Sequence, residues 1–356
     1  MRSISILHIS HISNYTPPVG YGGIELIVDL LAKYQKRKGH DVKVLGVKPL
    51  GINTDYHIIP LFSKPVKKPR LHHKFYTTIR SLVNSLHVEV VHVHVQWVAS
   101  NLAFLKPLDK AILLTLHADL SNNLASRILK ALKIPLVAIS YTQKERLESK
   151  GFKIFDVAYH GIEVDRYPFS RNKEDYLVYL GRIDPSKGVH IAVRASMRSG
   201  EKLVLIGPVA DQAYFDSLIR PFIDGKNIIY LGEVDFETKV KALSRAKALI
   251  YPVQYEEFFG LAMVEALACG TPVIGFAKGS VREIVKNGVT GFMVNDEDEV
   301  VEVVKRLHII DPLACRRDVE KRFSAENMVK KYEEIYEKLI ESAKKQGRKQ
   351  DYYLKR

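Results

Sequence analysis

Two carboxylates stand eight residues apart in one short stretch of the chain, Glu257 and Glu265, with Gly260 between them. The apolar run after Gly260 predicts a helix that ends at Gly270, because glycine followed by Pro272 commonly terminates a helix. Unpaired backbone N–H groups at a helix start bind anions, and carboxylates accept hydrogen bonds from hydroxyls. The pattern therefore fits a ligand with a diphosphate flanked by hydroxyl groups, which describes a nucleotide sugar.

A second chemical group is a loop that carries Arg182 and Lys187 directly after an apolar run. Gly181 and Gly188 lie beside these cations, and glycine lets the backbone approach a ligand closely. Charge accumulates on a diphosphate leaving group as its bond to a sugar breaks, and fixed cations stabilise that charge. The alternative interpretation is a plain turn with two surface cations.

Three histidines lie at strand-like positions: His92 and His94 on one face of a run, and His117 at the end of the next run. They lack a third close partner at ligand spacing, so we predict no metal site there. Packing is the better interpretation for His92, whereas packing and ligand contact both stay open for His94 and His117. The stretch 296–298 reads Asp-x-Asp, but an apolar-periodic run follows, which predicts an acidic helix start and no obligatory metal.

The elements that must position these residues alternate between short apolar runs and helical patterns. Expected strands are Ile4–Ile9, Val42–Val47, Val90–Val95, Ile112–His117, Leu136–Ile139, Tyr176–Leu180, Leu203–Ile206, Ile228–Leu231, Ala248–Pro252 and Val273–Phe276. Expected helices are Ile24–Arg37, His190–Met197, Gln212–Phe222, Glu237–Arg245 and Ala325–Lys345. The alternation predicts an α/β protein with two doubly wound domains, at 1–165 and 166–324, and a hinge between Val164 and Asp175.

Composition sets the class of protein. With 356 residues, 46% apolar and 26% charged, the chain is long enough for two domains that each bury a core. Its two cysteines provide no disulfide framework, which favours a reducing compartment. The first residues are too polar for a signal peptide, and no apolar run reaches about 18 residues. We therefore expect a cytoplasmic location.

The chain carries a formal net charge of +14, concentrated in Lys64–Lys74 and in the tail from Lys344 to Arg356. One interpretation is solvated loops and a frayed terminus, as charge runs commonly are. Another is peripheral attachment to an anionic membrane surface, on the cytoplasmic face. Nucleic-acid binding ranks third and is not expected, because no recognition helix, zinc site or aromatic platform accompanies the charge.

The motifs together resemble the GT4-type retaining glycosyltransferases. The two carboxylates are followed by Ala268-Cys269-Gly270-Thr271-Pro272-Val273, which completes the signature of that family. Other stretches match in order along residues from about 4 to about 300: Gly20–Glu25, Lys38–Val42, Val91–His94, Leu116–Asp119, Gly181–Gly188, Gly279–Val285 and Gly288–Phe292. One departure is Tyr159-His160-Gly161-Ile162-Glu163, where many relatives have Asn-Gly-Ile-Asp.

The resemblance implies the GT-B fold, in which two Rossmann-like domains face each other across a cleft that holds the active site. The first domain would bind the acceptor and the second the nucleotide-sugar donor. A C-terminal helix, about 325–356, would pack back on the first domain.

The resemblance also implies a role for each candidate residue. Arg182 and Lys187 would hold the diphosphate, and Glu265 the ribose diol. Glu257 would face the transferred sugar or its developing positive charge, and His117 would bond a sugar hydroxyl. The remaining donor-binding positions are Gly22, Gly23, Phe259, Gly260 and Leu261.

We therefore expect a retaining hexosyltransferase that moves a hexose from a nucleotide diphosphate sugar to a hydroxyl of a glycan or lipid-linked acceptor, without a cofactor or metal. A sugar-nucleotide epimerase or a glycan phosphorylase of the same architecture is one alternative. A non-enzymatic, basic nucleic-acid-binding protein is another, although it leaves the carboxylates without a role. The base, the sugar and the acceptor stay open.

Overall fold

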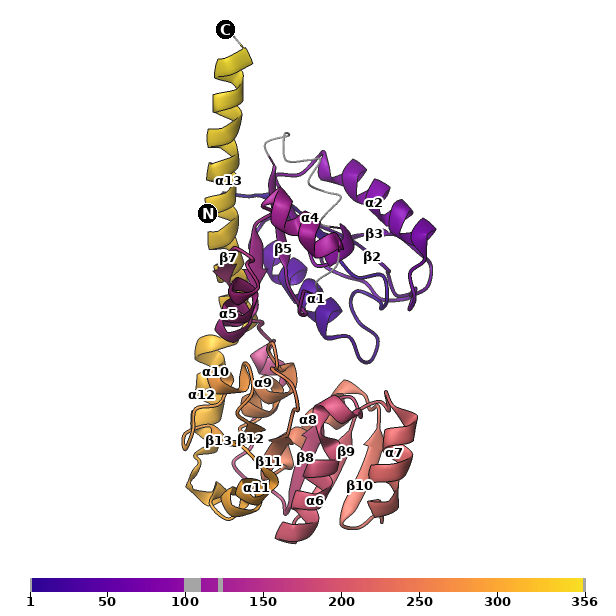
Figure 1. Ribbon diagram of the computed structural model, residues 1–356, viewed down its shortest axis with the longest axis vertical. Coiled ribbons are helices and arrows are strands. Elements are labelled where there is room, and N and C mark those ends of the chain that lie inside the picture. The colour runs from indigo at the N-terminus through magenta and orange to yellow at the C-terminus, as the bar shows by residue number, and fades with distance from the viewer. Residues whose placement is uncertain (1, 99–109, 121–123, 355–356) are drawn as a thin grey trace. The chain divides into compact units, whose positions relative to one another are not determined.

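The computed structural model describes residues 2–98, 110–120 and 124–354, with side chains described up to residue 345 except for 124 and 125. The chain divides into two compact units (Figure 1). Unit 1 is Met1–Gly161 with Ala325–Arg356, and unit 2 is Ile162–Ser324. The chain first passes from unit 1 to unit 2 between Gly161 and Ile162, four residues before the boundary predicted at 165. Ile162 belongs to unit 2 because it pairs with Ser324 there.

Unit 1 is built on a seven-stranded parallel sheet with the order β3-β2-β1-β4-β5-β6-β7. The strands are β1 Ser5–Ile9, β2 Asp41–Gly46, β3 His57–Pro60, β4 Val90–Val93, β5 Ala111–Thr115, β6 Leu136–Ala138 and β7 Ile154–Val157. All five predicted strands are confirmed. The two that were not predicted, β3 and β7, are the edge strands, whose exposed residues break the apolar run.

Helices surround this sheet (Figure 1): α1 Gly23–Arg37, α2 Leu71–Ser85, α4 Leu124–Leu132, α5 Tyr141–Ser149 and α13 Ala325–Leu354. Helix α1 buries Ile27, Val28 and Leu31, whose three- and four-residue spacing puts them on one face of the helix. Among the described residues, no helix combines the length and the apolarity that crossing a bilayer requires.

Unit 2 is built on a six-stranded parallel sheet with the order β10-β9-β8-β11-β12-β13. Its strands are β8 Tyr176–Leu180, β9 Lys202–Ile206, β10 Ile228–Gly232, β11 Ala248–Tyr251, β12 Val273–Phe276 and β13 Gly291–Val294, of which only the edge strand β13 was not predicted. Its α-helices are α6 Val189–Ser199, α7 Gln212–Leu218, α8 Phe236–Arg245, α9 Leu261–Ala268, α10 Val281–Ile284, α11 Glu297–Val304 and α12 Pro312–Arg322. The predicted acidic helix start is confirmed, because the side chain of Asp296 accepts a hydrogen bond from the N–H of Glu299 and caps α11.

Helix α13 joins unit 1 through polar groups that face inward. The hydroxyl of Tyr336 accepts a hydrogen bond from Gln35 of α1 at 3.1 Å, and the hydroxyl of Tyr332 lies 2.8 Å from Thr115 Oγ1 at the end of β5. Glu333 accepts hydrogen bonds from Lys38 at 2.6 Å and from His40 at 3.2 Å. The C-terminal segment is therefore part of the core of unit 1, although it follows unit 2 in the sequence.

A chain of histidines, all buried except the half-buried His117, continues this network along the strand ends. His8 lies 3.1 Å from His94, His94 lies 2.9 Å from His117, and His117 lies 3.3 Å from His160. Gln35 Oε1 accepts from His8 Nε2, which leaves His8 Nδ1 to accept from His94 Nε2–H. By the same reasoning His94 and His117 each donate through Nε2 and accept through Nδ1, and His160 Nε2–H donates to His117 Nδ1.

The fold also brings His8 beside His92 and His94, with ligand atoms of all three within 4.8 Å of one another. The sequence-based expectation that no third histidine lies close was therefore wrong, because β1 and β4 are neighbours in the sheet although far apart in the chain. His92 is satisfied by protein partners, Tyr336 at 2.7 Å and Thr115 at 2.7 Å. A hydrogen-bonded network accounts for the cluster.

We predict that lowering the pH from 7 to 5 destabilises unit 1. Burial lowers the pKa of His8 to about 4 and that of His160 to about 3, whereas unfolded histidine titrates near its ordinary value of 6.5. Between these values the unfolded chain binds more protons, so stability is complete above pH 6.5 and is lost as the pH falls towards 4. His8 alone should contribute a loss of about 2 kcal/mol at pH 5.

Thermal unfolding at the two pH values measures this loss. His8→Gln should reduce the pH dependence, while His57→Gln, at an exposed position of β3, should leave it unchanged. A wild-type protein that melts at the same temperature at pH 5 and pH 7 would contradict the prediction.

Candidate active site

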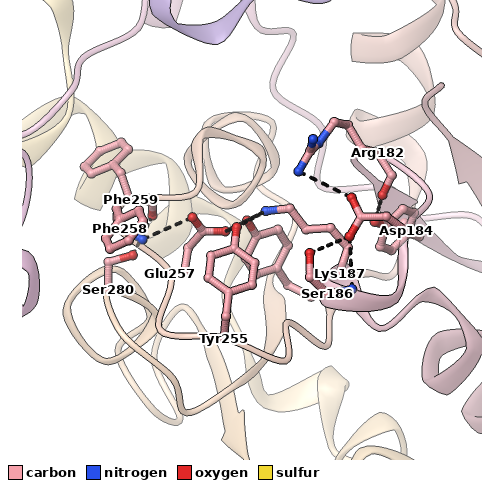
Figure 2. A network of polar contacts seen from close by, with 11 residues as sticks. Arg182, Asp184, Ser186, Lys187, Tyr255, Glu257, Phe258, Phe259 and Ser280 are labelled. Carbon is pink, nitrogen blue, oxygen red and sulfur yellow. Dashed lines mark hydrogen bonds and ion pairs between the residues drawn. The ribbon is translucent and has the colours of Figure 1, made fainter. Parts of the chain in front are cut away.

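Glu257 and Lys187 form a buried ion pair in unit 2 (Figure 2). Lys187 Nζ lies 2.7 Å from Glu257 Oε2, and only 13% and 8% of the two side chains are exposed. The hydroxyl of Tyr251 donates to the same oxygen at 2.6 Å and that of Tyr255 at 2.8 Å. The N–H of Phe258 donates to the other oxygen at 3.1 Å, so the carboxylate accepts from four groups.

These partners decide the charge of Glu257. Burial acts to raise the pKa of its carboxyl, but the ammonium of Lys187 and the hydrogen bonds from Lys187, Tyr251 and Tyr255 outweigh burial and hold the pKa below its ordinary value. Burial and the neighbouring carboxylate raise the pKa of both tyrosines, so each hydroxyl keeps its proton to donate. Glu257 is therefore a permanent anion at neutral pH.

The backbone around Glu257 is fixed by the loop between β12 and α10. Gly279 has φ 58°, and a Cβ there would lie 2.2 Å from the Glu257 carbonyl oxygen, a separation that no side chain tolerates. The next residue, Ser280, donates its N–H to the same carbonyl at 2.8 Å and its hydroxyl to the carbonyl of Phe259 at 2.9 Å. The motif that begins at Gly279 thus positions the carboxylate without touching its oxygens.

Lys187 ends the short 3₁₀ helix η3, Pro185–Lys187, which Asp184 caps through the N–H of Ser186. Gly188 follows in a left-handed conformation, and a Cβ there would lie 2.1 Å from the Pro252 carbonyl oxygen. The Ser186 carbonyl accepts from the N–H of Gln254 at 2.8 Å, which ties this loop to the loop that carries Glu257. The cation and the carboxylate are held by one backbone framework.

Arg182 lies on the same loop, and its guanidinium is 3.3 Å from Asp184 Oδ2 (Figure 2). Its side chain is 45% exposed, in contrast to the buried ammonium of Lys187. The predicted pair of cations is therefore present on one loop. One cation is fixed against Glu257, and the other has free surface with which to contact a ligand.

Glu265 lies on α9 in a second polar cluster. Its Oε1 accepts from Tyr167 at 2.8 Å and from Lys239 of α8 at 2.5 Å. Within the part of the chain that the structure describes, no hydrogen bond to the other oxygen, Oε2, is recorded. The carboxylate is thus held in place through one oxygen and has acceptor capacity left on the other.

Gly260 caps α9 with φ 82°, as the sequence predicted for a helix that begins there. Gly260 and Leu261 are half-exposed, and among the described residues no hydrogen bond from either N–H is recorded. The side chain of Phe259 is buried against Phe323, with ring centroids 5.8 Å apart, so only its backbone has access to a donor.

The candidate residues of unit 1 lie in two places. Gly22 caps α1 and Gly23 begins it, and a Cβ at Gly22 would lie 2.9 Å from Pro18 Cβ and 3.2 Å from Glu25 Oε2. Burial raises the pKa of the Glu25 carboxyl, which lies beside the glycine loop and was not among the predicted site residues. His117 is half-buried, and both of its ring nitrogens have histidine partners, so a sugar contact would have to replace one of them.

The structure brings Arg182, Lys187 and Glu257 together on two adjoining loops, while Glu265 sits in its own cluster on α9. Sequence reasoning missed the residues that hold these groups: Tyr167, Lys239, Tyr251 and Tyr255. Tyr251 and Tyr255 are close to Glu257 in the sequence, and this closeness could have identified them as its hydrogen-bond partners. Tyr167 and Lys239 are far from Glu265 in the chain and gave none.

Known proteins match the chain along most of its length. A family model described as "Glycosyltransferase Family 4" matches residues 21–166, and one described as "Glycosyl transferases group 1" matches residues 163–322. Glycogen synthase of Mycobacterium tuberculosis is 26% identical over 358 residues, which covers 85% of this chain and 86% of that protein.

Solved structures have the same fold at low identity. Sucrose-phosphate synthase from Thermosynechococcus elongatus superposes with a TM-score of 0.79 at 20% identity, over 96% of this chain and all (100%) of the other. HepE from Anabaena, solved in complex with UDP-glucose, superposes with a TM-score of 0.76 at 17% identity, over 94% and 100% of the two chains.

Two family models in sequence order, two parallel sheets and the superpositions agree with one another. They confirm an enzyme, so the non-enzymatic alternative does not hold. The chain belongs to the group 1, family 4 glycosyltransferases and has their GT-B fold.

Proposed function

We propose that this protein is a retaining hexosyltransferase that takes its hexose from a nucleotide diphosphate sugar and transfers it to a hydroxyl of a glycan or lipid-linked acceptor. The observation that carries the proposal is the buried Glu257–Lys187 pair, in which Glu257 lies on the loop that leads directly into the start of α9. Such a pair would supply a fixed positive charge for the leaving diphosphate and a fixed negative charge for the sugar in the transition state.

The diphosphate would be bound by Lys187, by Arg182 and by the N–H groups of Gly260 and Leu261. Two of the three ammonium hydrogens of Lys187 bond Glu257 and Tyr255, at 2.7 and 2.5 Å. The third makes only a 3.4 Å contact with Tyr251, so a phosphate oxygen would be a better acceptor for it. The exposed guanidinium of Arg182 and the helix start add donors that need no rearrangement of the core.

The role proposed for Glu257 is electrostatic. Four donors already bind its carboxylate, and such bonds stabilise the anion and weaken it as a nucleophile. In the proposed reaction the bond between the sugar C1 and the phosphate oxygen breaks while the acceptor oxygen bonds C1 on the same face. The acceptor hydroxyl gives its proton to the leaving phosphate oxygen, and Glu257 stabilises the positive charge on the sugar.

The role proposed for Glu265 is to bind the ribose. Its Oε2 has acceptor capacity, and Tyr167 and Lys239 orient it through Oε1. A carboxylate suits a vicinal diol, because it accepts charge-assisted hydrogen bonds from both hydroxyls. HepE was solved with UDP-glucose and a starch synthase with ADP, which supports nucleotide binding by this fold without naming the base used here.

We predict that Lys187→Met lowers kcat by about 100- to 1000-fold, the range expected for loss of one donor aimed at transition-state charge. KM for the donor should change less, because Arg182 and the helix start remain. Initial rates of nucleoside diphosphate release measure both parameters. Lys247→Met, which removes a lysine that pairs with Glu201 elsewhere in unit 2, is the matched control and should retain activity. Equal rates for wild type and Lys187→Met would contradict the role of this cation.

We also predict that Glu265→Gln weakens donor binding by about 10- to 100-fold, because a charged acceptor is worth about 1.5–3 kcal/mol more than an unmade bond. Thermal unfolding with UDP, GDP, ADP and their hexose conjugates measures it. A ligand at about 100 times its Kd should add roughly 2.7 kcal/mol of stability to the wild type. Glu201→Gln removes an equivalent paired carboxylate and should keep the shift. A Glu265→Gln shift equal to that of the wild type would exclude Glu265 from the donor site.

A further inference from the structure

Helix α2 turns most of its apolar side chains away from the protein. Leu71, Phe75, Ile79 and Val83 follow one another at four-residue spacing, which places them on one stripe of the helix surface. Together with Leu86 they form what we call the apolar stripe, whose members are 82%, 66%, 41%, 53% and 49% exposed for Leu71, Phe75, Ile79, Val83 and Leu86. Single exposed apolar residues are ordinary on proteins, but a continuous row is not.

The fully buried positions of the same helix all carry hydroxyl groups, and Leu82 packs partly buried against the core of unit 1. Thr77, Ser81 and Ser85 are fully buried. Each hydroxyl donates to the backbone carbonyl four residues earlier in the helix, at 2.8, 2.7 and 2.6 Å. The hydroxyls are therefore satisfied without water, which makes their burial tolerable. A helix at a protein–water boundary turns its apolar face inward and its polar face to water. The outer face of α2 is therefore suited to contact with an apolar partner.

The charge around the stripe has one sign. No Asp or Glu occurs between Asp55 and Glu89. Exposed cations lie at Lys64, Lys67, Lys68, Arg70 and Lys74, which we call the basic flank. Among the described residues, none of the recorded ion pairs involves Lys64, Lys68 or Lys74. A partner that covers the apolar stripe would therefore meet cations that are not neutralised within unit 1.

We propose that the apolar stripe and the basic flank dock unit 1 on the surface of an anionic lipid bilayer, with α2 lying in the plane of the interface. Apolar side chains of such a helix enter the boundary between headgroups and acyl chains, while its cations meet lipid phosphates. A second copy of the chain would bring a like-charged flank against this one. A nucleic acid would use the cations but leave the apolar stripe in water.

This inference is independent of donor binding in unit 2, and it adds a partner to the proposed function. Unit 1, to which the family resemblance assigns the acceptor, would be held at a surface where lipid-linked acceptors are found. The proposal concerns attachment to one leaflet, since α2 has 15 residues and lies on the sheet of unit 1.

Co-sedimentation with lipid vesicles tests the proposal on the full chain. One set of vesicles is phosphatidylcholine alone, and the other is equal parts of phosphatidylcholine and phosphatidylglycerol. We expect binding to the anionic vesicles only, weakened by added salt. Lys64→Glu/Lys68→Glu/Lys74→Glu should lower the partition coefficient by at least about 100-fold, at the roughly fivefold per lysine that membrane-surface charge provides.

Matched controls distinguish vesicle binding by this surface from effects of net charge and of exposed apolar residues elsewhere. Lys153→Glu/Lys226→Glu/Lys305→Glu changes the net charge equally at exposed sites elsewhere and should still bind. Phe75→Asn/Val83→Asn should also lose vesicle binding, whereas Met197→Asn, at an exposed apolar position of α6, should not. The nucleotide-dependent thermal shift should be the same in all of these variants, so loss of docking cannot be confused with loss of the donor site.

Three results would overturn the proposal. The first is a wild-type protein that stays in the supernatant with both vesicle types. The second is equal loss of binding in the control charge variant, which would reduce the effect to net charge. The third is a concentration-dependent dimer in sedimentation velocity that Phe75→Asn/Val83→Asn abolishes, which would assign the stripe to a second copy of the chain.

Discussion

The candidate site depends on keeping an ionised carboxylate and an ammonium together in the interior of unit 2. A buried charge is costly unless it is paired and hydrogen-bonded, and Glu257 meets that condition through Lys187 and two tyrosines. The pairing works only if two loops stay in register. Gly188 and Gly279 allow backbones to approach so closely that any side chain at either position would push the loops apart.

Unit 1 meets a similar constraint with neutral groups. The amide oxygen of Gln35 accepts from His8 and so sets the direction of the hydrogen bonds along the histidines. The amide nitrogen of Gln35 donates to the hydroxyl of Tyr336, which extends the network to the C-terminal helix. A buried network of this kind is favourable only when each member has a partner, so α13 is needed to complete it. The same requirement explains why His117 is engaged on both ring nitrogens.

Sequence reasoning predicted both parallel sheets, apart from three short edge strands, and it predicted the start of α9 at Gly260. Apolar periodicity and glycine positions are local, so they can be interpreted without a structure. The partners of the carboxylates could not be predicted in this way, because Tyr167 reaches Glu265 from the segment before β8, and Lys239 reaches it through the packing of α8 on α9. The apolar stripe of α2 was also missed, because the spacing of Thr77, Ser81 and Ser85 indicates a buried face only when their burial is known.

The central claim is retaining transfer of a hexose from a nucleotide sugar, and proton NMR of the anomeric signal during turnover tests it most directly. With the donor identified by binding and a simple alcohol or sugar as acceptor, we predict an α-linked product from an α-linked donor, with one nucleoside diphosphate released for each bond formed. A β-linked product, or an isomerised sugar nucleotide without release of the diphosphate, would contradict the reaction assigned to Glu257 and Lys187.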